Sequence, residues 1–261
     1  MHKILFPEAY NEFIQNAASR LRNEGVCEPV MEICDIQKAC QMVADGYVDA
    51  MVAGIDYSSR DVILACRDII GMAGPEPRPG EKKLFSSLFV ADLPDGKRYI
   101  IGDGATCKNP TEVQLADIIE LIHDAAMRIF DEDPLIAMLS FSTAGSGGSD
   151  PSMDRIADAI ALVRQRRPDI IVDGEMQLDA AINPRVGSKK MPHSDVAGRA
   201  NVLITPDINS GNILYKSIEQ FAHAQVAGPI LLGFNKPVSD LSRGSTVEDI
   251  VLTTKCLEKL I

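Results

Sequence analysis

The chain has 261 residues, of which 46% are hydrophobic and 24% are charged. This composition is that of a folded globular protein and excludes a mainly disordered chain. The chain has a net charge of -11, no Trp and only 5% aromatic residues. These features disfavour nucleic acid as a partner, because a surface that binds nucleic acid needs positive charge and aromatic side chains for base stacking.

Short apolar runs alternate with helical patterns along most of the chain, which is typical of βαβ units around a mainly parallel sheet. In the first part, the pattern predicts strands at 3–6, 28–33 and 48–53 and helices at 9–23 and 36–45. We therefore predict an α/β protein.

The alternation of predicted strands and helices is interrupted at residues 74–80, Gly-Pro-Glu-Pro-Arg-Pro-Gly. These prolines and glycines prevent a helix or a central strand, and we place a lobe boundary there. Two β-rich runs follow at 84–92 and 98–102, separated by turn residues at 94–97 that predict a hairpin. The sheet is therefore expected to be mixed in this region.

Two long helices are predicted in the middle of the chain from their N-terminal residues. One runs from about 110 to 129, with Asn109 as N-cap and proline at the first helical position. The other begins at Asp150 and ends in a basic run before Pro168. The apolar runs at 135–141 and 169–172 are predicted to be strands buried on both faces.

A loop rich in glycine and hydroxyl groups, residues 142–149, joins a predicted strand to a predicted helix. Its glycines allow backbone N–H groups to converge on an anion, and Ser142, Thr143 and Ser146 add hydroxyls near a helix N-terminus. We take these three as candidate substrate-binding residues, although a plain connecting loop explains them too. The loop matches neither a P-loop nor the dinucleotide pattern Gly-x-Gly-x-x-Gly, which disfavours nucleotide hydrolysis and hydride transfer.

Two further polar segments follow predicted strands. Residues 173–179 carry three carboxylates, which solvated acids or a helix cap explain better than a metal site. Residues 206–212 precede a helix predicted to run to about 223. Capping does not account for all of these polar groups, so Asp207 and Asn212 are candidate substrate-binding residues.

The segment 235–250 is the most informative part of the sequence. Arg243 offers a planar, always charged fork for a phosphate, and the small Ser242 beside it lets the backbone approach. Asp249 falls in the first turns of the last predicted helix, and Lys236 adds a second positive charge. A loop arginine paired with a helix acid explains the same spacing equally well.

Four segments in order resemble motifs of the phosphate acetyltransferase and phosphate butyryltransferase family. Residues 138–150 resemble its hydroxyl-rich loop, 172–181 its Asp-Gly-Glu-[Leu/Met]-Gln segment, 196–216 its Val-Ala-Gly-[Lys/Arg]-Ala-Asn and Pro-Asp-x-x-x-Gly-Asn motifs, and 228–249 its C-terminal signature. The helix start at Asn109 also matches. The resemblance is dense over about residues 85–255.

The resemblance implies a fold of two αβα lobes with mainly parallel sheets and a cleft between them, like that of isocitrate and isopropylmalate dehydrogenases. Residues 1–78 and 238–261 would form the first lobe, and residues 79–237 the second. The family also implies a homodimer.

The family reaction moves an acyl group between coenzyme A and inorganic phosphate (acyl-CoA + phosphate = acyl phosphate + CoA) by direct transfer in a ternary complex. It needs no cofactor, because coenzyme A is a substrate. Matched residue by residue, Arg243 is the phosphate-binding arginine, Ser242 hydrogen-bonds near the thioester, and Asp249 assists the CoA thiol. The expected partners are therefore acyl-CoA or CoA and phosphate or acyl phosphate.

The N-terminal part departs from the acetyltransferase pattern. A helical insertion of the family, with its arginine, is lacking between Ile33 and Gln37, and the arginine that closes a second family motif falls on Leu64. The shortened lobe is nearer to that of phosphate butyryltransferase, which leaves the acyl chain length open.

Two arginines about one helical turn from Leu64 are candidate replacements for the missing cations. Arg60 is expected at the start of a helix, where the N-terminus favours an anion, whereas Arg67 lies about two turns further in. Arg60 is therefore our candidate, with Ser58 and Ser59 as neighbouring hydroxyl and backbone groups.

The cysteines and the N-terminus bear on the compartment. Six cysteines without a Cys-x-x-Cys pair, and only four histidines, predict neither a disulfide framework nor a metal site. The apolar part of residues 1–8 is too short for a signal peptide, and no apolar run approaches the ~20 residues that span a bilayer. We therefore expect a cytoplasmic protein without a membrane partner.

Three functions thus remain in view. A phosphate acetyltransferase is the first expectation. A phosphate butyryltransferase-like enzyme with a longer-chain preference, or a non-catalytic CoA-ester-binding module of the same fold, are the alternatives. A dehydrogenase of the related fold is disfavoured by the missing nucleotide-binding patterns.

Overall fold

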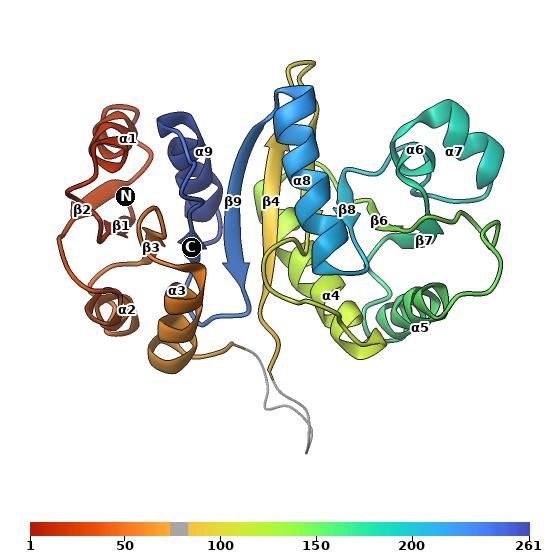
Figure 1. Ribbon diagram of the computed structural model, residues 1–261, viewed down its shortest axis with the longest axis horizontal. Coiled ribbons are helices and arrows are strands. Elements are labelled where there is room, and N and C mark those ends of the chain that lie inside the picture. The colour runs from red at the N-terminus through yellow and green to blue at the C-terminus, as the bar shows by residue number, and fades with distance from the viewer. Residues whose placement is uncertain (74–82) are drawn as a thin grey trace. The chain divides into compact units, whose positions relative to one another are not determined.

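The computed structural model describes residues 1–73 and 83–261, which form two units (Figure 1). Unit 1 comprises Met1–Phe85 and Gln225–Ile261, and unit 2 comprises Ser86–Ala224. The predicted proline-rich boundary at 74–80 lies outside the described residues. Residues 225–237, predicted to belong to the second lobe, lie in unit 1 because strand β9 (Gln225–Leu232) pairs antiparallel with β10 (Val238–Asp240).

Unit 1 contains a sheet with the strand order β2-β1-β3-β10-β9, in which the first four strands are parallel. The remaining elements are β1 (Lys3–Phe6), β2 (Glu28–Met31), β3 (Ala50–Ala53), α1 (Glu12–Asn23), α2 (Ile36–Ala44), α3 (Ser59–Ala65), the π-helical segment η1 (Cys66–Ile70) and α9 (Val247–Glu258). Leu5, Met51 and Val238 on neighbouring strands are fully buried, and their burial stabilises this layer.

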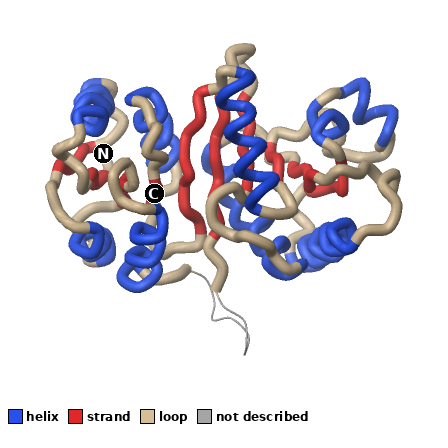
Figure 2. Tube along the Cα trace, viewed as in Figure 1, coloured by secondary structure: helices blue, strands red, loops and turns tan. Residues whose placement is uncertain are grey.

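Unit 2 contains a sheet with the order β4-β5-β8-β6-β7, in which only β4 is antiparallel to its neighbour. Its elements are β4 (Ser86–Asp92), β5 (Arg98–Gly102), β6 (Ile136–Leu139), β7 (Val172–Met176), β8 (Val202–Ile204), α4 (Glu112–Ile129), α5 (Pro151–Arg166), α6 (Leu178–Ile182), α7 (Pro184–Lys190) and α8 (Ile208–Ala222). The β4–β5 pair is the predicted hairpin. Figure 2 shows strands flanked by helices in each unit.

Several predicted boundaries were wrong by two or three residues, and two of them have a clear local cause. Helix α4 is capped by Thr111 rather than Asn109, because Thr111 and Gln114 form a reciprocal capping box. The strand predicted at 169–172 is β7, which begins at Val172, where it pairs with Ile136 of β6. The residues just before it form a turn after α5, closed by a hydrogen bond from Ile170 N to Arg167 O.

Among the helices that the structure describes, none combines the length and apolar character needed to cross a bilayer.

Candidate functional site

The C-terminal ends of β3 and β10 lie side by side at one edge of the unit 1 sheet. Asp240 pairs in register with Ala53, and Leu241 N donates a hydrogen bond of 2.6 Å to Ala53 O. The turns that follow the two strands, 54–58 and 241–246, therefore start next to each other. This edge brings together six of the predicted site residues: Ser58, Ser59, Arg60, Ser242, Arg243 and Asp249.

Arg243 is exposed in the turn between β10 and α9. The turn is closed by a hydrogen bond from Ser245 N to Ser242 O (2.9 Å), and Ser242 Oγ accepts from Gly244 N (3.3 Å). Among the carboxylates of the described residues, none forms an ion pair with the Arg243 guanidinium. The side chain is therefore available to an anion from solution.

Asp249 has a local partner in Thr246, the N-cap of α9. Its Oδ2 accepts hydrogen bonds from Thr246 N (2.9 Å) and Thr246 Oγ1 (2.8 Å), and Asp249 N donates to Thr246 Oγ1 (3.2 Å). This reciprocal capping box starts α9 at Val247. The alternative in which Asp249 pairs with the loop arginine is therefore not what the structure shows.

The β3–α3 turn places Ser58 and Arg60 at the same edge. Ser58 caps α3, since its hydroxyl accepts from Asp61 N (3.2 Å) and donates to Asp61 Oδ2 (2.7 Å). Arg60 is exposed in the first turn of this helix. Arg67, the other candidate replacement, pairs with its neighbour Asp68 at 2.7 Å.

A buried carboxylate that sequence reasoning missed shapes this turn. Glu8 is fully buried. Its Oε2 accepts from Gly54 N (2.8 Å) and Ile55 N (3.3 Å), and its Oε1 accepts from Asp56 N (2.6 Å) and Tyr57 N (3.0 Å). Charge-assisted bonds of this kind are about twice as strong as neutral ones. The signal in the sequence was an acid two residues after the first predicted strand, following Pro7.

Lys236 does not belong to this edge. It precedes β10, whereas Arg243 follows it, so the two cations lie at opposite ends of the strand. The prediction grouped Lys236 with Arg243 because they are close in sequence. The extended strand between them places the two side chains at opposite edges of the sheet.

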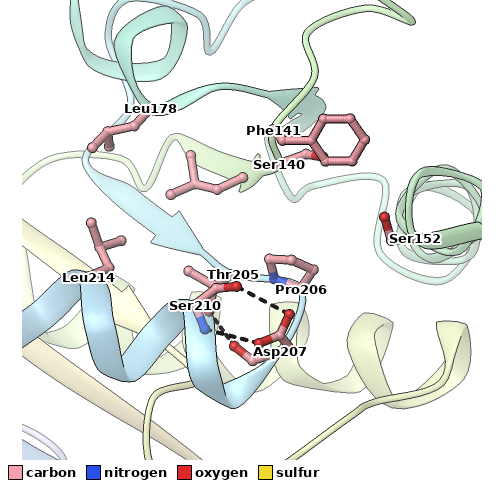
Figure 3. Close-up of a pocket in the computed structure, with 10 residues that line it drawn as sticks. Ser140, Phe141, Ser152, Leu178, Thr205, Pro206, Asp207, Ser210 and Leu214 are labelled. Atoms are coloured by element: carbon pink, nitrogen blue, oxygen red, sulfur yellow. Dashed lines mark hydrogen bonds between the residues drawn. The ribbon is translucent and has the colours of Figure 1, made fainter. Parts of the chain in front are cut away.

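Unit 2 contains a pocket of about 350 Å³ at the C-terminal edge of β6 and β8 (Figure 3). This size falls in the range of small-molecule sites. Apolar side chains from four segments line it together with hydroxyl groups and one acid: Leu139, Ser140, Phe141, Ser152, Leu178, Thr205, Pro206, Asp207, Ser210 and Leu214. Of the residues predicted from sequence, only Asp207 lines this pocket.

Asp207 forms the polar side of the pocket and caps α8. Its Oδ1 accepts from Ser210 N (3.0 Å), and its Oδ2 accepts from Ser210 Oγ (3.1 Å). Thr205 Oγ1 donates to Asp207 O (3.2 Å), as Figure 3 shows. Asn212, one turn further along α8, instead donates to Gly104 O (3.2 Å) and fixes the helix to the turn after β5.

Hydrogen bonds to β7 and to the residue after it stabilise the loop at 142–149. Ser142 is buried, and its Oγ donates to Glu175 Oε1 (2.9 Å) and accepts from Gly147 N (2.9 Å). Thr143 is also buried, and its Oγ1 accepts from Gln177 N (2.9 Å). The two hydroxyls predicted to bind substrate therefore stabilise the loop, because parallel pairing of β6 with β7 brings Glu175 and Gln177 beneath it.

Ser146 is the exposed hydroxyl of the three predicted in this loop. It accepts a hydrogen bond from Thr143 N (3.2 Å).

The acids that were predicted at the end of a strand lie partly inside it: Asp173 and Glu175 are residues of β7 itself. Over residues 1–73 and 83–261, no three His, Cys, Asp or Glu side chains gather as a metal site would require.

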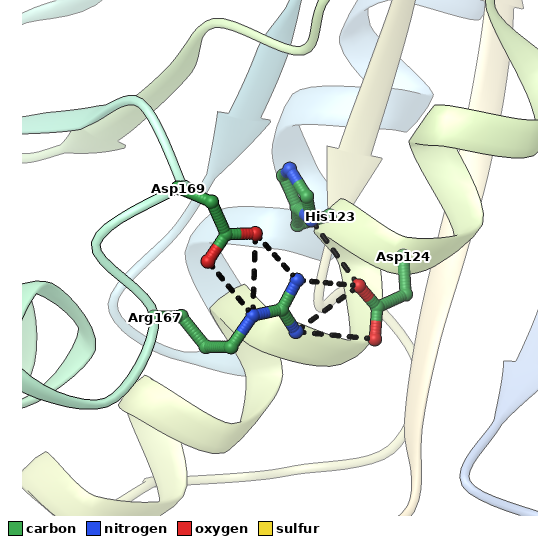
Figure 4. Close-up of polar contacts among 4 residues, drawn as sticks. All are labelled: His123, Asp124, Arg167 and Asp169. Carbon is green, nitrogen blue, oxygen red and sulfur yellow. Dashed lines mark hydrogen bonds and ion pairs between the residues drawn. The ribbon is translucent and has the colours of Figure 1, made fainter.

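A cluster of charges joins α4 to the end of α5 (Figure 4). Arg167 pairs with Asp124 (3.2 Å) and Asp169 (2.8 Å), and His123 Nδ1 lies 3.2 Å from Asp124 Oδ1. Hydrogen bonds to Asp169 and then Asp124 raise the pKa of Arg167, and Arg167 lowers that of Asp169. These charges compensate one another. Arg167, the last residue of the predicted basic run, therefore links the end of α5 to α4 and already has two carboxylate partners.

Comparison with known proteins identifies the family. The family model described as phosphate acetyl/butaryl transferase matches residues 30–256. The chain is 43% identical over 220 residues to a phosphate acetyltransferase of Treponema pallidum, with 82% of this chain and 64% of the relative covered. It is 45% identical over 212 residues to a phosphate acetyltransferase of Corynebacterium glutamicum, with 81% of this chain and 62% of the relative covered. The chain thus spans less than two thirds of the length of these relatives.

The solved structures agree with the sequence comparison. A phosphotransacetylase from Streptococcus pyogenes is 33% identical, with a TM-score of 0.84, and the match covers 99% of this chain and 93% of that chain. The predicted fold class, α/β with mainly parallel sheets like those of isocitrate and isopropylmalate dehydrogenases, is confirmed.

Proposed function

The chain belongs to the phosphate acetyl/butaryl transferase family, and from this premise we propose that it transfers a short acyl group between coenzyme A and inorganic phosphate. The observation that carries the proposal is the sheet edge of unit 1. There the exposed Arg243, without a carboxylate partner among the described residues, shares an edge with the exposed Arg60 and two capped helix starts. Such an edge suits an anionic substrate in a protein of net charge -11.

In the proposed reaction, a phosphate oxygen forms a bond to the thioester carbonyl carbon and the carbon–sulfur bond breaks. The sulfur leaves as thiolate and takes up a proton to give the CoA thiol. Arg243 would hold the phosphate and stabilise negative charge that develops on the substrate, with Ser242 as a hydrogen-bond donor near the thioester. Asp249 would orient the thiol proton. Catalysis would come mainly from positioning, and no cofactor is proposed.

We also propose, of unit 2 taken by itself, that its pocket binds an apolar group of the size of a short acyl chain. Leu139, Phe141, Leu178 and Leu214 give it apolar walls, while Asp207 and Ser210 supply one polar side. A volume of about 350 Å³ is about ten times the ~30 Å³ that one water takes up in the liquid. An acetyl group alone would leave most of it empty, which favours a longer acyl chain as the second candidate.

The proposal is tested by giving the purified protein acetyl-, propionyl- or butyryl-CoA with inorganic phosphate. Release of free thiol is followed with a thiol reagent, and acyl phosphate is captured as the hydroxamate. We expect thiol release that depends on phosphate and matches acyl phosphate formed. A reaction without phosphate would indicate a thioesterase, and binding of acyl-CoA without product would indicate the non-catalytic module.

Chain-length preference tests the pocket separately. Leu214→Trp would fill part of the pocket and is expected to lower kcat/KM for butyryl-CoA about tenfold relative to acetyl-CoA, because one or two excluded methylenes are worth ~1–3 kcal/mol. Gln220→Trp, at an exposed position further along α8 that does not line the pocket, is the matched control. An equal effect on both substrates would place the acyl chain elsewhere.

We also propose a cytoplasmic homodimer. All six cysteines are free thiols, which suits a reducing compartment. Helix α8 exposes two large apolar side chains, Ile213 (66%) and Phe221 (85%), and we propose this helix as the contact surface. Sedimentation of the wild type and of Phe221→Asp measures the oligomeric state, and a monomer at micromolar concentration in the wild type would contradict the dimer.

A further inference from the structure

Asp240 is a buried acid in the middle of the unit 1 edge that the proposed reaction does not use. It is the last residue of β10 and lies three positions before Arg243. Its residue exposure is 2%, and its Oδ1 is buried without a hydrogen-bond partner among the described residues. A carboxylate in this place would lose its hydration and gain only a hydrogen bond with the Ser59 side chain in return, whereas a neutral carboxyl group would lose much less.

The surroundings of Asp240 link the two turns of the edge. A Cβ atom at Gly54 would collide with Asp240 Oδ1 and would lie 2.7 Å from Leu241 N, so these groups are in close contact. The φ angle of +107° at Gly54 favours glycine at this point. Gly54 N also donates to Glu8. The β10 end therefore packs directly on the turn that Glu8 organises.

The titratable groups around Asp240 are both acidic. Glu8 faces it from the segment after β1, and Cys66 faces it from η1, where contact with Cys40, burial and Asp240 raise the thiol pKa. The pKa of Asp240 is raised to about 7, mainly by burial; a hydrogen bond with the Ser59 side chain lowers it in part, and the charge of Glu8 adds to the rise. Ionisation would place a second carboxylate beside Glu8 in a region with little water.

We propose that Asp240 is a positioning residue, which in its uncharged form holds the 241–246 turn, and with it Arg243, against the 54–58 turn. Ionised Asp240 is repelled by Glu8 and draws water toward Gly54. The repulsion and the added water disturb the hydrogen bond from Leu241 N to Ala53 O, which holds the start of the 241–246 turn. Phosphate binding by Arg243 then weakens as the proton is lost.

The sign of the pH dependence follows from the direction of the shift. An unfolded Asp titrates near ~3.9, and folding raises the pKa of Asp240 to about 7. The folded protein therefore holds this proton more tightly, and the resulting stabilisation is complete below about pH 4 and is lost as the pH rises through about 7. Asp240→Asn keeps the shape and removes the titration.

A first test needs no activity. In the infrared spectrum, the wild type should show a protonated-carboxyl band at pH 6 that disappears by pH 8.5 and is absent from Asp240→Asn. The melting temperature of the wild type should fall over the same range relative to Asp240→Asn, whereas Asp68→Asn, at an exposed acid of η1, should follow the wild type. Identical carboxyl bands in wild type and Asp240→Asn would overturn the inference.

The second test rests on the proposed function and uses inorganic phosphate. At pH 8.5 the uncharged fraction of Asp240 is about one thirtieth, so the wild-type KM for phosphate should rise by up to about thirtyfold relative to that of Asp240→Asn, with kcat changing less. Comparison with the variant removes the titration of phosphate itself. Parallel pH profiles in an active enzyme would overturn the positioning role. If no acyl-CoA reacts at all, the proposed function fails, and the infrared and melting results still decide the state of Asp240.

Discussion

Arg243 is the residue on which the proposed chemistry depends most. We expect Arg243→Ala to raise the KM for phosphate and lower kcat/KM by about 10- to 100-fold, since a charge-assisted contact is worth ~1.5–3 kcal/mol. Lysine should restore little, because it lacks the planar fork. Initial rates at varied phosphate measure this, and unchanged phosphate saturation would remove Arg243 from the site.

The two arginines near Leu64 differ in what surrounds them. Arg67 is paired with Asp68, whereas Arg60 is exposed at the start of α3 on the same edge as Arg243. We expect Arg60→Ala to lower kcat/KM more than tenfold, about 1.4 kcal/mol, and Arg67→Ala to have little effect. If neither change matters in an active protein, Ser58, Ser59 and the backbone must bind the substrate in this region.

Asp249 has a structural role that must be separated from the proposed catalytic one. Asp249→Asn keeps an acceptor for Thr246 but removes the charge, and we expect kcat to fall by about 10²–10⁴ with little change in melting temperature. Thr246→Ala breaks the cap instead and should cost ~0.5–2 kcal/mol of stability while retaining most of kcat. Asp249→Asn with near-normal kcat would leave the acid as a helix cap alone.

At the scale of elements, the β3–α3 turn depends on a single buried carboxylate. Glu8→Gln replaces one acceptor with a donor that faces two backbone N–H groups, so we expect a loss of about 2 kcal/mol or more in the free energy of unfolding. Urea unfolding measures it. Glu12→Gln, an exposed acid in the first turn of α1, is the control, and equal stability of the two variants would show that the turn does not need Glu8.

At the scale of the whole molecule, the sequence determined the fold class well because hydrophobic periodicity and helix caps are local signals. The alternation of apolar runs with helices predicted parallel sheets, and the cap at Asp150 was found from its neighbours. Ser142 and Thr143 were predicted to bind substrate because their own sequence neighbourhood is a loop rich in hydroxyl groups. The partners that hold them, Glu175 in β7 and Gln177 just after it, are more than 30 positions away, so the local sequence could not show that these side chains are buried. The contacts of Glu8 and Asp240 are equally remote in sequence, and periodicity carries no information about them.

The return of the chain to unit 1 at residue 225 has a consequence for how the protein is made. Strands β3 and β10 are neighbours in one sheet, yet all of unit 2 lies between them in sequence. A ribosome therefore releases every residue of unit 2 before β10 exists, and unit 2, being continuous, can fold while unit 1 still lacks β9, β10 and α9. Until then β3 has an unpaired edge, on which a chaperone would act or aggregation would begin. The late segment that closes this edge also carries Arg243, so the proposed anion site forms last.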